Sequence, residues 1–482
     1  MDTTSAVLKE RLEKINQLKS KGFTLYQDQF KPTESIQNLL ESFQEGKTVK
    51  VSGRMMTRRA HGKTAFADLH DATGKIQIYA KLDVLGAEQF ELFQLLDLGD
   101  ILGIEGNLFV THKGEKTINV SRFVLLSKIV QVLPEKWHGL KDVEIRYRQR
   151  YVDLIINEEA RGIFIKRSQI VRYVRSFLDE RGFMEVETPM MQSIPGGARA
   201  KPFVTHHETL DTDLFLRVAP ELYLKRLLVG GFEKVYEINR NFRNEGISTK
   251  HNPEFTMLEV YEAYSDYEGM MNLTEDLMTS LIEKIHHTTK IPYGEETLNF
   301  NRPWRRASFH SLLKEKSGHD WRKANVKELA KKVGIPLDQY GEDIDILNEA
   351  FDRFVQPHLI NPTFVTDYPA ITTPLAKLKQ GEPDLVARFE LFIGKMEIAN
   401  AFSELNDPFE QRERMMKQQE IIGAGKIIDE DFLRALEYGM PPAGGLGIGI
   451  DRLVMLVTNS QSIRDVILFP QLKPEKNDIE SK

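Results

Sequence analysis

The hydrophobic period changes near residue 48, and this change limits the possible fold more than any other feature of the chain. Over residues 48–132, apolar and polar residues alternate in short runs that turns and single glycines separate. The runs are Val49–Val51, Phe66–Asp68, Ile76–Tyr79 and Ile118–Val120. A period of two is typical of strands. Several short strands so close together predict a small barrel, for which the OB type is the most economical architecture.

The regions on either side of the predicted barrel have different patterns. Residues 1–47 form a predicted N-terminal helical segment, since apolar residues recur there at helical spacing. Residues 133–145 are predicted to be a linker. Strand and helix patterns alternate over residues 146–482, which we predict to be one mixed α and β domain. Within it, residues from about 265 to 385 are richer in charge and helix, and we expect a helical insertion.

The absence of cysteine narrows the chemistry, because it excludes disulfides, thiolate nucleophiles and cysteine-ligated metals. The 65 basic and 71 acidic residues give a net charge of −6, so a nucleic-acid partner would have to be bound by local basic patches. No run of apolar residues approaches the ~18 that a membrane span needs. The N-terminus also lacks a secretory pattern, and we expect a cytoplasmic protein with no membrane contact.

Two glycine-rich stretches resemble common nucleotide-binding loops but fail their patterns. Gly62-Lys63-Thr64 ends like a phosphate loop, yet Thr57 stands where that loop requires its upstream glycine. In Gly445–Gly449 the third glycine comes one residue too early for the dinucleotide fingerprint. A nucleotide would therefore be bound by another architecture.

Polar and aromatic side chains share one face of two consecutive predicted strands. On the second strand they are Phe255, Met257, Glu259 and Tyr261. The same phase on the first strand gives Glu237, Asn239, Asn241 and Arg243. Joined by the polar loop 244–252, the two strands would form an antiparallel floor for a charged ligand. The planar guanidinium of Arg243 suits a phosphate or a carboxylate.

Three segments carry a family resemblance: Arg181–Pro189, Lys234–Tyr264 and Gly445–Arg452. In order and content they resemble motifs 1, 2 and 3 of class II aminoacyl-tRNA synthetases. With the OB-like region in front, residues from about 50 to 470 resemble class IIb, and in detail the lysyl-tRNA synthetases. The resemblance implies an α+β fold: an N-terminal OB-type β-barrel, then a class II catalytic domain built on a mostly antiparallel sheet flanked by helices. It also implies a homodimer.

By this resemblance, ATP is a substrate and Arg243 bridges its α-phosphate and the carboxylate of the amino acid. Glu245 would accept from the adenine amino group, and His251 and Arg452 would contact the γ-phosphate. Phe255 and Arg452 would sandwich the adenine ring. Arg243 and Arg452 are thus the expected catalytic residues. The full expected ATP site is Arg243, Glu245, His251, Asn252, Phe255, Glu390 and Arg452.

The resemblance also implies a Mg²⁺ ion held by Glu390 and Glu397. Two carboxylates suit this ion, which takes few protein ligands and shares its coordination with phosphates. Glu397, however, is out of phase with Asn400, Phe402 and Glu404 on the same predicted strand. A β-bulge between Glu397 and Asn400 is therefore required.

In the family, the glutamate that matches Glu404 binds the ε-ammonium of lysine, helped by the tyrosine that matches Tyr261. Glu221 would bind the α-ammonium, with Gly197 nearby. Such buried carboxylates would reject neutral side chains by a factor on the order of 10⁴. We also expect Ala401 to narrow the pocket slightly. The full expected lysine site is Gly197, Glu221, Arg243, Glu259, Tyr261, Asn400, Phe402 and Glu404.

The implied activity is a lysine–tRNA ligase, which forms lysyl-adenylate and pyrophosphate and then transfers lysine to the 3′-OH of tRNA(Lys). The barrel would read the anticodon with Phe66 as a stacking ring, Gln77 as a base reader and Arg58 as a further contact.

Other readings remain open. An aspartyl or asparaginyl enzyme would need cations where Glu404 stands, and a lysine-adding paralogue that modifies a translation factor lacks the OB domain. A non-catalytic RNA-binding protein on the same scaffold is a third reading, but the intact Arg243, Glu390, Glu397 and Arg452 argue against it.

Overall fold

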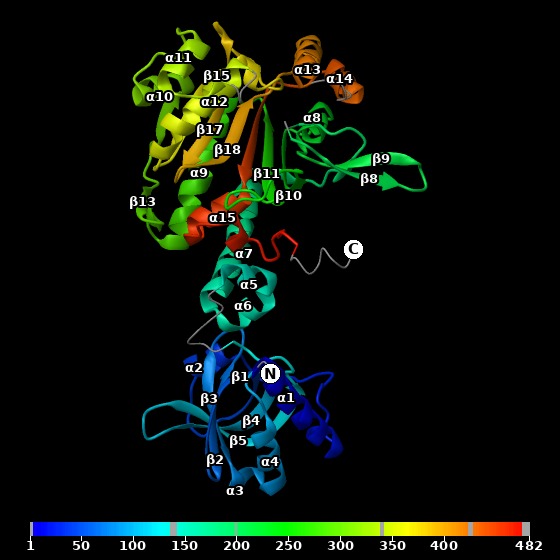
Figure 1. Ribbon diagram of the computed structural model, residues 1–482, viewed down its shortest axis with the longest axis vertical. Coiled ribbons are helices and arrows are strands. Elements are labelled where there is room, and N and C mark those ends of the chain that lie inside the picture. Colours follow the sequence, from blue (N-terminus) through cyan, green and yellow to red (C-terminus); the bar gives the residue numbers. More distant parts are fainter. Residues whose placement is uncertain (1–2, 135–141, 198–199, 338–341, 423–427, 475–482) are drawn as a thin grey trace. The chain divides into compact units, whose positions relative to one another are not determined.

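The computed structural model describes residues 3–134, 142–197, 200–337, 342–422 and 428–474 (Figure 1). The chain forms two compact units, residues 1–141 and 142–482. One hydrophobic core lies in the first unit, and two clusters of buried apolar residues lie in the second. Within the described residues, no helix combines the length and the apolar character that crossing a membrane requires.

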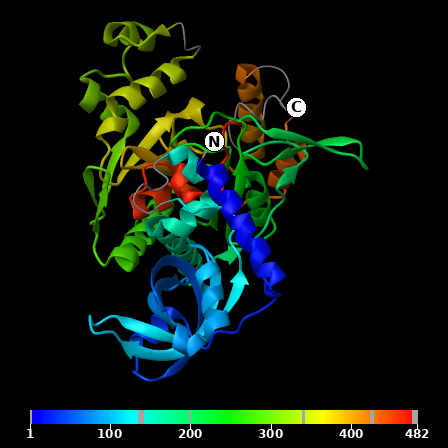
Figure 2. The ribbon, with the colours of Figure 1, turned by 60° about the horizontal axis from the view of Figure 1, so that its bottom comes forward.

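A five-stranded barrel forms the body of the first unit. Its strands pair in the order β1-β2-β3-β5-β4, and β1 pairs with both β2 and β4. The strands are β1 Thr48–His61, β2 Thr64–His70, β3 Lys75–Lys81, β4 Ile101–Val110 and β5 Lys116–Ser127. Helices α1 Thr3–Ser20, α2 Ile36–Glu41, α3 Leu82–Leu85 and α4 Ala87–Leu95 accompany them. Figure 2 shows the strands curving around a common interior, and the predicted OB-type barrel is confirmed.

The alternating pattern that predicted the barrel decides which side chains face its interior. Ala65, Ala67 and Leu69 on β2 are fully buried, whereas Phe66 and Asp68 between them are partly exposed. Burial alternates in the same way along β3. The outer face of β2 and β3 therefore carries the polar and aromatic side chains.

A large and mostly antiparallel sheet forms the centre of the second unit, as predicted. Its strand order is β14-β15-β17-β18-β19-β11-β10-β6, and among these described strands the pairs β14–β15 and β10–β6 are parallel while the others are antiparallel. The strands are β14 Arg305–Ser308, β15 Thr363–Pro369, β17 Glu382–Ile393, β18 Met396–Ser403, β19 Ala443–Gly449, β11 Glu254–Ala263, β10 Lys234–Phe242 and β6 Met184–Glu185, with β16 Leu378–Lys379 paired to β17. Two small sheets contain β7 Met191–Gln192, β9 Thr212–Leu216 and β8 Phe203–His207, and β12 Lys290–Tyr293 and β13 Glu296–Asn299.

Helices connect and cover these strands. They are α5 Val143–Arg148, α6 Arg150–Ile156, α7 Glu158–Asp179, α8 Glu221–Val229, α9 Tyr267–His286, α10 Phe309–Ser317, α11 Val326–Val333, α12 Asp343–Phe354, α13 Pro408–Ile422, α14 Glu430–Glu437, α15 Ile450–Thr458 and α16 Ile463–Val466. The stretch 265–385 contains α9 to α12, and it also contributes strands β14 and β15 to the central sheet.

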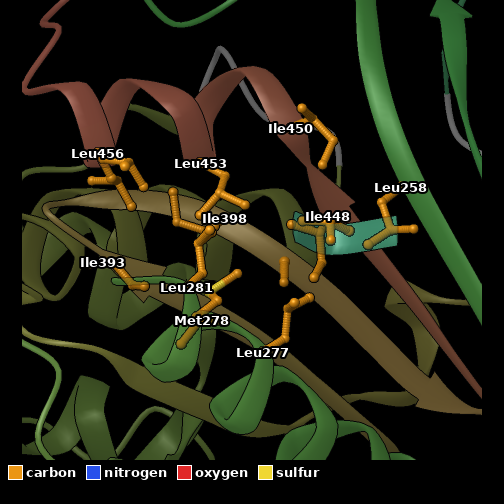
Figure 3. Packing of buried hydrophobic residues seen from close by; sticks show 14 of the residues in the cluster. Leu258, Leu277, Met278, Leu281, Ile393, Ile398, Ile448, Ile450, Leu453 and Leu456 are labelled. Atoms are coloured by element: carbon orange, nitrogen blue, oxygen red, sulfur yellow. The ribbon is translucent and has the colours of Figure 1, made fainter. Parts of the chain in front are cut away.

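The two faces of the central sheet have different surroundings. On one face, apolar side chains of β11, β18 and β19 pack against α7, α9 and α15. Figure 3 shows part of this core, where α9 and α15 contribute Leu277, Met278, Leu281, Leu453 and Leu456 around Ile398 and Ile448. Ala401 is fully buried in this core, so the prediction that it narrows the pocket was wrong. The polar side chains between these residues face the other side, where the cavity described next lies.

Candidate active site

A cavity of about 490 Å³ opens on the polar face of the central sheet. Its walls come from the β10–β11 hairpin, β18, β19 and the start of α8. The volume is within the range of ligand pockets. With one exception, the ATP, lysine and metal residues expected from sequence line it: Gly197, Glu221, Arg243, Glu245, His251, Asn252, Phe255, Glu259, Tyr261, Glu397, Asn400, Phe402, Glu404 and Arg452. The exception is Glu390, which lines a neighbouring cavity of about 500 Å³.

The hairpin beneath the cavity has the predicted phase. β10 and β11 are antiparallel, and Glu237 lies opposite Glu259. All four alternating residues expected on the ligand face of β11 line the cavity, so the predicted floor is confirmed for this strand. Of the four residues expected on the first strand, only Arg243 lines the cavity, and Glu237 is instead buried in an ion pair with Arg217. The register with β19 then defines the two ends of the cavity. Met257 lies opposite Gly449 at one end, and Tyr261 lies opposite Gly445 at the other.

Cationic side chains gather at the Gly449 end of the cavity. Arg452 follows this glycine, and its Nη2 lies 3.1 Å from Nε2 of His251. Its Nη1 donates to the main-chain carbonyl of Glu397 at 2.7 Å. The guanidinium of Arg243 lies 5.1 Å from the centre of the Phe255 ring. Burial, and then the charge of Arg452, lower the pKa of His251, which favours a neutral imidazole. This end of the cavity suits a polyanion.

Asp451 fixes the start of α15, on which Arg452 stands. Asp451 is buried and accepts hydrogen bonds from Nη1 of Arg167 at 2.6 Å and from the main-chain N–H of Thr256 at 2.7 Å. These contacts join α15 to α7 and β11. The sequence offered no definite role for Asp451, since its partner Arg167 is far away along the chain.

Carboxylates gather at the opposite, Gly445 end. Glu221, Glu259 and Glu404 are all buried and line the cavity. Burial, reinforced by Glu221, raises the pKa of Glu259 to about 8, and Tyr261 donates a hydrogen bond to Glu259 at 3.1 Å. Burial also raises the pKa of Glu404. Buried carboxylates without enough counter-charge are costly, so this end of the cavity favours a cationic ligand.

Lys225 also belongs to this group, although no motif of the sequence marks it as a site residue. Its ammonium lies 2.7 Å from Oε1 of Glu221 and 2.5 Å from Oε2 of Glu404. The available signal was its position four residues after Glu221 on a helix, where the two side chains become neighbours.

A β-bulge brings Glu397 to the ligand face, as its phase required. Leu391 lies opposite Ala399 and Phe392 lies opposite Glu397, so Ile398 is the extra residue. Glu397 and Glu390 both line the neighbouring cavity.

Glu390 is held by two partners and is affected by Glu397. It accepts hydrogen bonds from Tyr368 and Arg388, and burial, with a contribution from the charge of Glu397, raises its pKa to about 7. Among the described residues, no group of three acidic or histidine side chains could hold a metal ion. Two oxygen-donating residues nevertheless fit Mg²⁺, which completes its coordination with phosphates and water.

The barrel presents a row of aromatic rings on its outer face. Phe66 stacks on Tyr79 with ring centres 4.5 Å apart, and Tyr79 lies 6.0 Å from Phe109. Gln77 accepts a hydrogen bond from Thr117 at 3.0 Å on the same side. The row thus adds two rings, Tyr79 and Phe109, to the predicted stacking position Phe66. The alternation of buried and exposed residues along β3 and β4 could have indicated that both rings lie on the outer face.

Arg58 lies elsewhere on the barrel unit, at the end of α4. Its Nη1 donates to the carbonyl groups of Phe93, Gln94 and Leu96 at 3.3, 2.9 and 2.5 Å. These carbonyls belong to the last turn of α4 and the residue after it, where orphan acceptors need donors. Arg58 therefore completes the hydrogen bonding of this helix.

Comparison with known proteins agrees with this geometry. Residues 142–473 match the family described as tRNA synthetases class II (D, K and N), and residues 49–126 match the OB-fold nucleic acid binding domain. The lysine–tRNA ligase of Carboxydothermus hydrogenoformans is 55% identical over 97% of this chain and 98% of its own. That of Syntrophomonas wolfei is 54% identical over 98% of both chains, and that of Clostridium botulinum is 47% identical over 99% and 97%. This chain therefore belongs to the class II tRNA synthetases of the D, K and N group.

Proposed function

We propose that this protein is a lysine–tRNA ligase that activates L-lysine with ATP and transfers it to tRNA(Lys). The observation that carries the proposal is the cavity with cations at one end and three buried carboxylates at the other. Full-length relatives that carry the name lysine–tRNA ligase support it. An aspartate site would need cations in place of Glu404, so the aspartyl reading is not favoured.

The carboxylate end accounts for the choice of amino acid. Glu404 would bind the ε-ammonium of lysine, and the hydroxyl of Tyr261 would lie close to that ammonium. Glu221 would bind the α-ammonium. Gly197 adopts a positive φ of 84°, and a Cβ there would lie 3.2 Å from that of Glu221, so the loop can approach the α-ammonium only as glycine. Glu259, Asn400 and Phe402 complete the pocket. A neutral side chain would leave buried charges unpaired, which is why rejection should be strong.

The cationic end accounts for activation. The carboxylate of lysine attacks the α-phosphorus of ATP in line, pyrophosphate leaves, and lysyl-adenylate remains bound. Arg243 contacts both reacting groups and stabilises the developing charge, so catalysis rests on positioning and electrostatics. Glu245, Asn252 and Phe255 would hold the adenosine, while His251 and Arg452 would contact the γ-phosphate.

Glu390 and Glu397 would hold Mg²⁺ delivered with ATP. The ion would neutralise part of the phosphate charge. The role of this chain is to place the two carboxylates together, through the bulge at Ile398, and to orient Glu390 with Tyr368 and Arg388.

The second step and the partners follow from the same proposal. The 3′-OH of tRNA(Lys) attacks the acyl carbonyl of the adenylate, and no protein nucleophile is needed. Phe66 and Gln77 would contact the anticodon, whereas Arg58, which is bound to the end of α4, is not proposed as a contact. A homodimer through α7 and β6 is supported by the exposed apolar side chains of Ile165 and Met184. We place the activity in the cytoplasm, where ATP, lysine and tRNA meet.

The test is amino-acid-dependent exchange between ATP and pyrophosphate, without tRNA, across the twenty amino acids. We expect exchange with lysine alone and its loss in Glu404→Gln. Glu437→Gln, an exposed glutamate on α14, is the matched control and should behave like the wild type. Exchange with a different amino acid would reassign the substrate, and no exchange from folded protein with Mg²⁺ would refute the enzyme.

A further inference from the structure

The ammonium group of Lys225 contacts the carboxylate cluster from its protein side. Its side chain is fully buried, and its Nζ lies 5.5 Å from the centre of the Phe402 ring. Glu221, Phe402 and Glu404 line the cavity, and Lys225 lies behind them. A ligand in the cavity and the ammonium of Lys225 would therefore contact the two carboxylates from different sides.

Only one of the two ion pairs of Lys225 follows from local structure. Lys225 stands four residues after Glu221 on α8, a spacing that brings these side chains together on any helix. Glu404, which follows β18, is 179 residues farther along the chain than Lys225. Its contact with Lys225 therefore ties α8 to the end of β18 and sets the separation of the two carboxylates.

The charges around this group nearly balance for one particular ligand. Glu221, Glu259 and Glu404 supply three negative charges when ionised, and Lys225 supplies one positive charge. The remaining groups that act on the cluster are Tyr261, Arg217, Arg243 and Arg388. Arg217 is paired with Glu237, and Arg388 is paired with Glu390. In the empty cavity Glu259, whose pKa is raised to about 8, holds its proton, so Glu221, Glu404 and Lys225 leave one negative charge. The two ammonium groups of a lysine molecule, together with Lys225, would balance all three carboxylates in their ionised form.

We infer that Lys225 is a positioning residue that determines specificity: it keeps Glu221 and Glu404 ionised and correctly spaced, so that the cavity accepts an amino acid with two ammonium groups. The inference rests on the proposed function of the site. Like charges in a buried site cannot all ionise without a counter-ion.

The titration of the cluster supports the same role. Burial raises the pKa of Glu404, and the charge of Lys225 acts against that rise. Burial alone would lower the pKa of Lys225, but the two carboxylates outweigh it and the pKa is raised. Without Lys225, the pKa values of Glu221 and Glu404 would be higher still, and a lysine ligand would have to displace a proton from this pair more often.

The test is Lys225→Met in the full-length enzyme, with the KM for lysine measured by exchange between pH 6.5 and 8.5. We expect KM to rise at least roughly tenfold at the lower pH, which corresponds to one pKa unit, and the rise to shrink as pH increases. At saturating lysine, kcat should stay within about threefold of wild type, because the ATP end of the cavity is untouched. Lys234→Met, which removes a surface lysine paired with Glu262 on β11, is the matched control.

The outcomes separate this inference from the proposed function. Wild-type protein that does not exchange with lysine refutes the proposed function. Wild-type exchange together with an unchanged KM in Lys225→Met, or a loss of kcat and thermal stability alone, overturns only the role of Lys225.

A second variant covers the case in which Lys225→Met does not fold. In Glu221→Gln one carboxylate charge is gone, so adding Lys225→Met should change KM for lysine by less than about threefold. An equally large effect in that background, or failure of the double variant to fold, would assign Lys225 a purely structural role and overturn the inference.

Discussion

A Cβ atom at Gly445 would lie 1.8 Å from Oε1 of Glu404, closer than any side chain permits. Gly445 lies opposite Phe402 on β18 and opposite Tyr261 on β11, so it stands in the middle of the proposed lysine site. The carboxylate of Glu404 occupies the space that a side chain at position 445 would fill.

Gly445→Ala should therefore impair lysine binding more than ATP binding. We expect the KM for lysine to rise by about 100-fold, equal to about 2.8 kcal/mol, because Glu404 must leave its position. The KM for ATP should change little. Gly162→Ala, on α7 with nothing within 4 Å of the added atom, is the control. An equal rise in both KM values would mean that the strand, and not Glu404, had moved.

Glu259 should make the stability of the empty enzyme depend on pH. Its pKa is raised to about 8 in the folded protein from an ordinary value of 4.5. Since the folded state then holds a proton that the unfolded state releases, stability falls as pH rises between these values. Glu259→Gln mimics the neutral acid, so its melting temperature relative to wild type should increase from pH 5 to pH 8 and then level off. Glu262→Gln on the same strand should show no such trend, and a flat difference for Glu259→Gln would contradict a raised pKa.

The two proposed metal ligands should control the requirement for Mg²⁺. In Glu390→Gln and Glu397→Gln, we expect the Mg²⁺ concentration for half-maximal exchange to rise at least about tenfold, because one of two protein ligands is lost. The KM for lysine should be nearly unchanged. Glu382→Gln, at the start of β17, where Glu382 is half-buried and paired with Arg322 and Lys379, is the comparison. An unchanged Mg²⁺ titration in both variants would remove these residues from the metal site.

The aromatic row of the barrel should matter only when tRNA is present. Phe66→Ala should raise the KM for tRNA(Lys) by about 5- to 150-fold, from the roughly 1–3 kcal/mol that base stacking contributes. ATP–pyrophosphate exchange, which needs no tRNA, serves as the internal control and should keep its wild-type rate. A variant that loses both activities would point to a folding defect in the barrel.

Much of the site could be predicted because strand alternation is a local property. It placed Glu259 and Tyr261 on one face and required a bulge before Asn400, and the structure has both. The same alternation, applied to Ala401, would have put that residue in the core, where it lies. The incorrect expectation came from the family resemblance. A resemblance identifies a position in the sequence, but it does not say on which face of the strand the side chain at that position lies.

Contacts between distant segments could not be predicted. The pairing of Lys225 with Glu404, and of Asp451 with Arg167, depends on how strands and helices meet across the sheet. A buried lysine four residues after a glutamate has the same sequence signature as an exposed pair on any helix. The structure was needed to show that this lysine is buried and has a second partner.

The two ends of the cavity have a further consequence for how an amino acid enters. Arg243 and Arg452 lie toward one end of β11, and Glu221, Glu259 and Glu404 toward the other. This polarity orients a dipolar molecule as it approaches. A lysine molecule that entered in the opposite orientation would place its carboxylate among three other carboxyl groups. The electrostatic field of the cavity therefore turns the attacking carboxylate toward ATP before lysine contacts any phosphate.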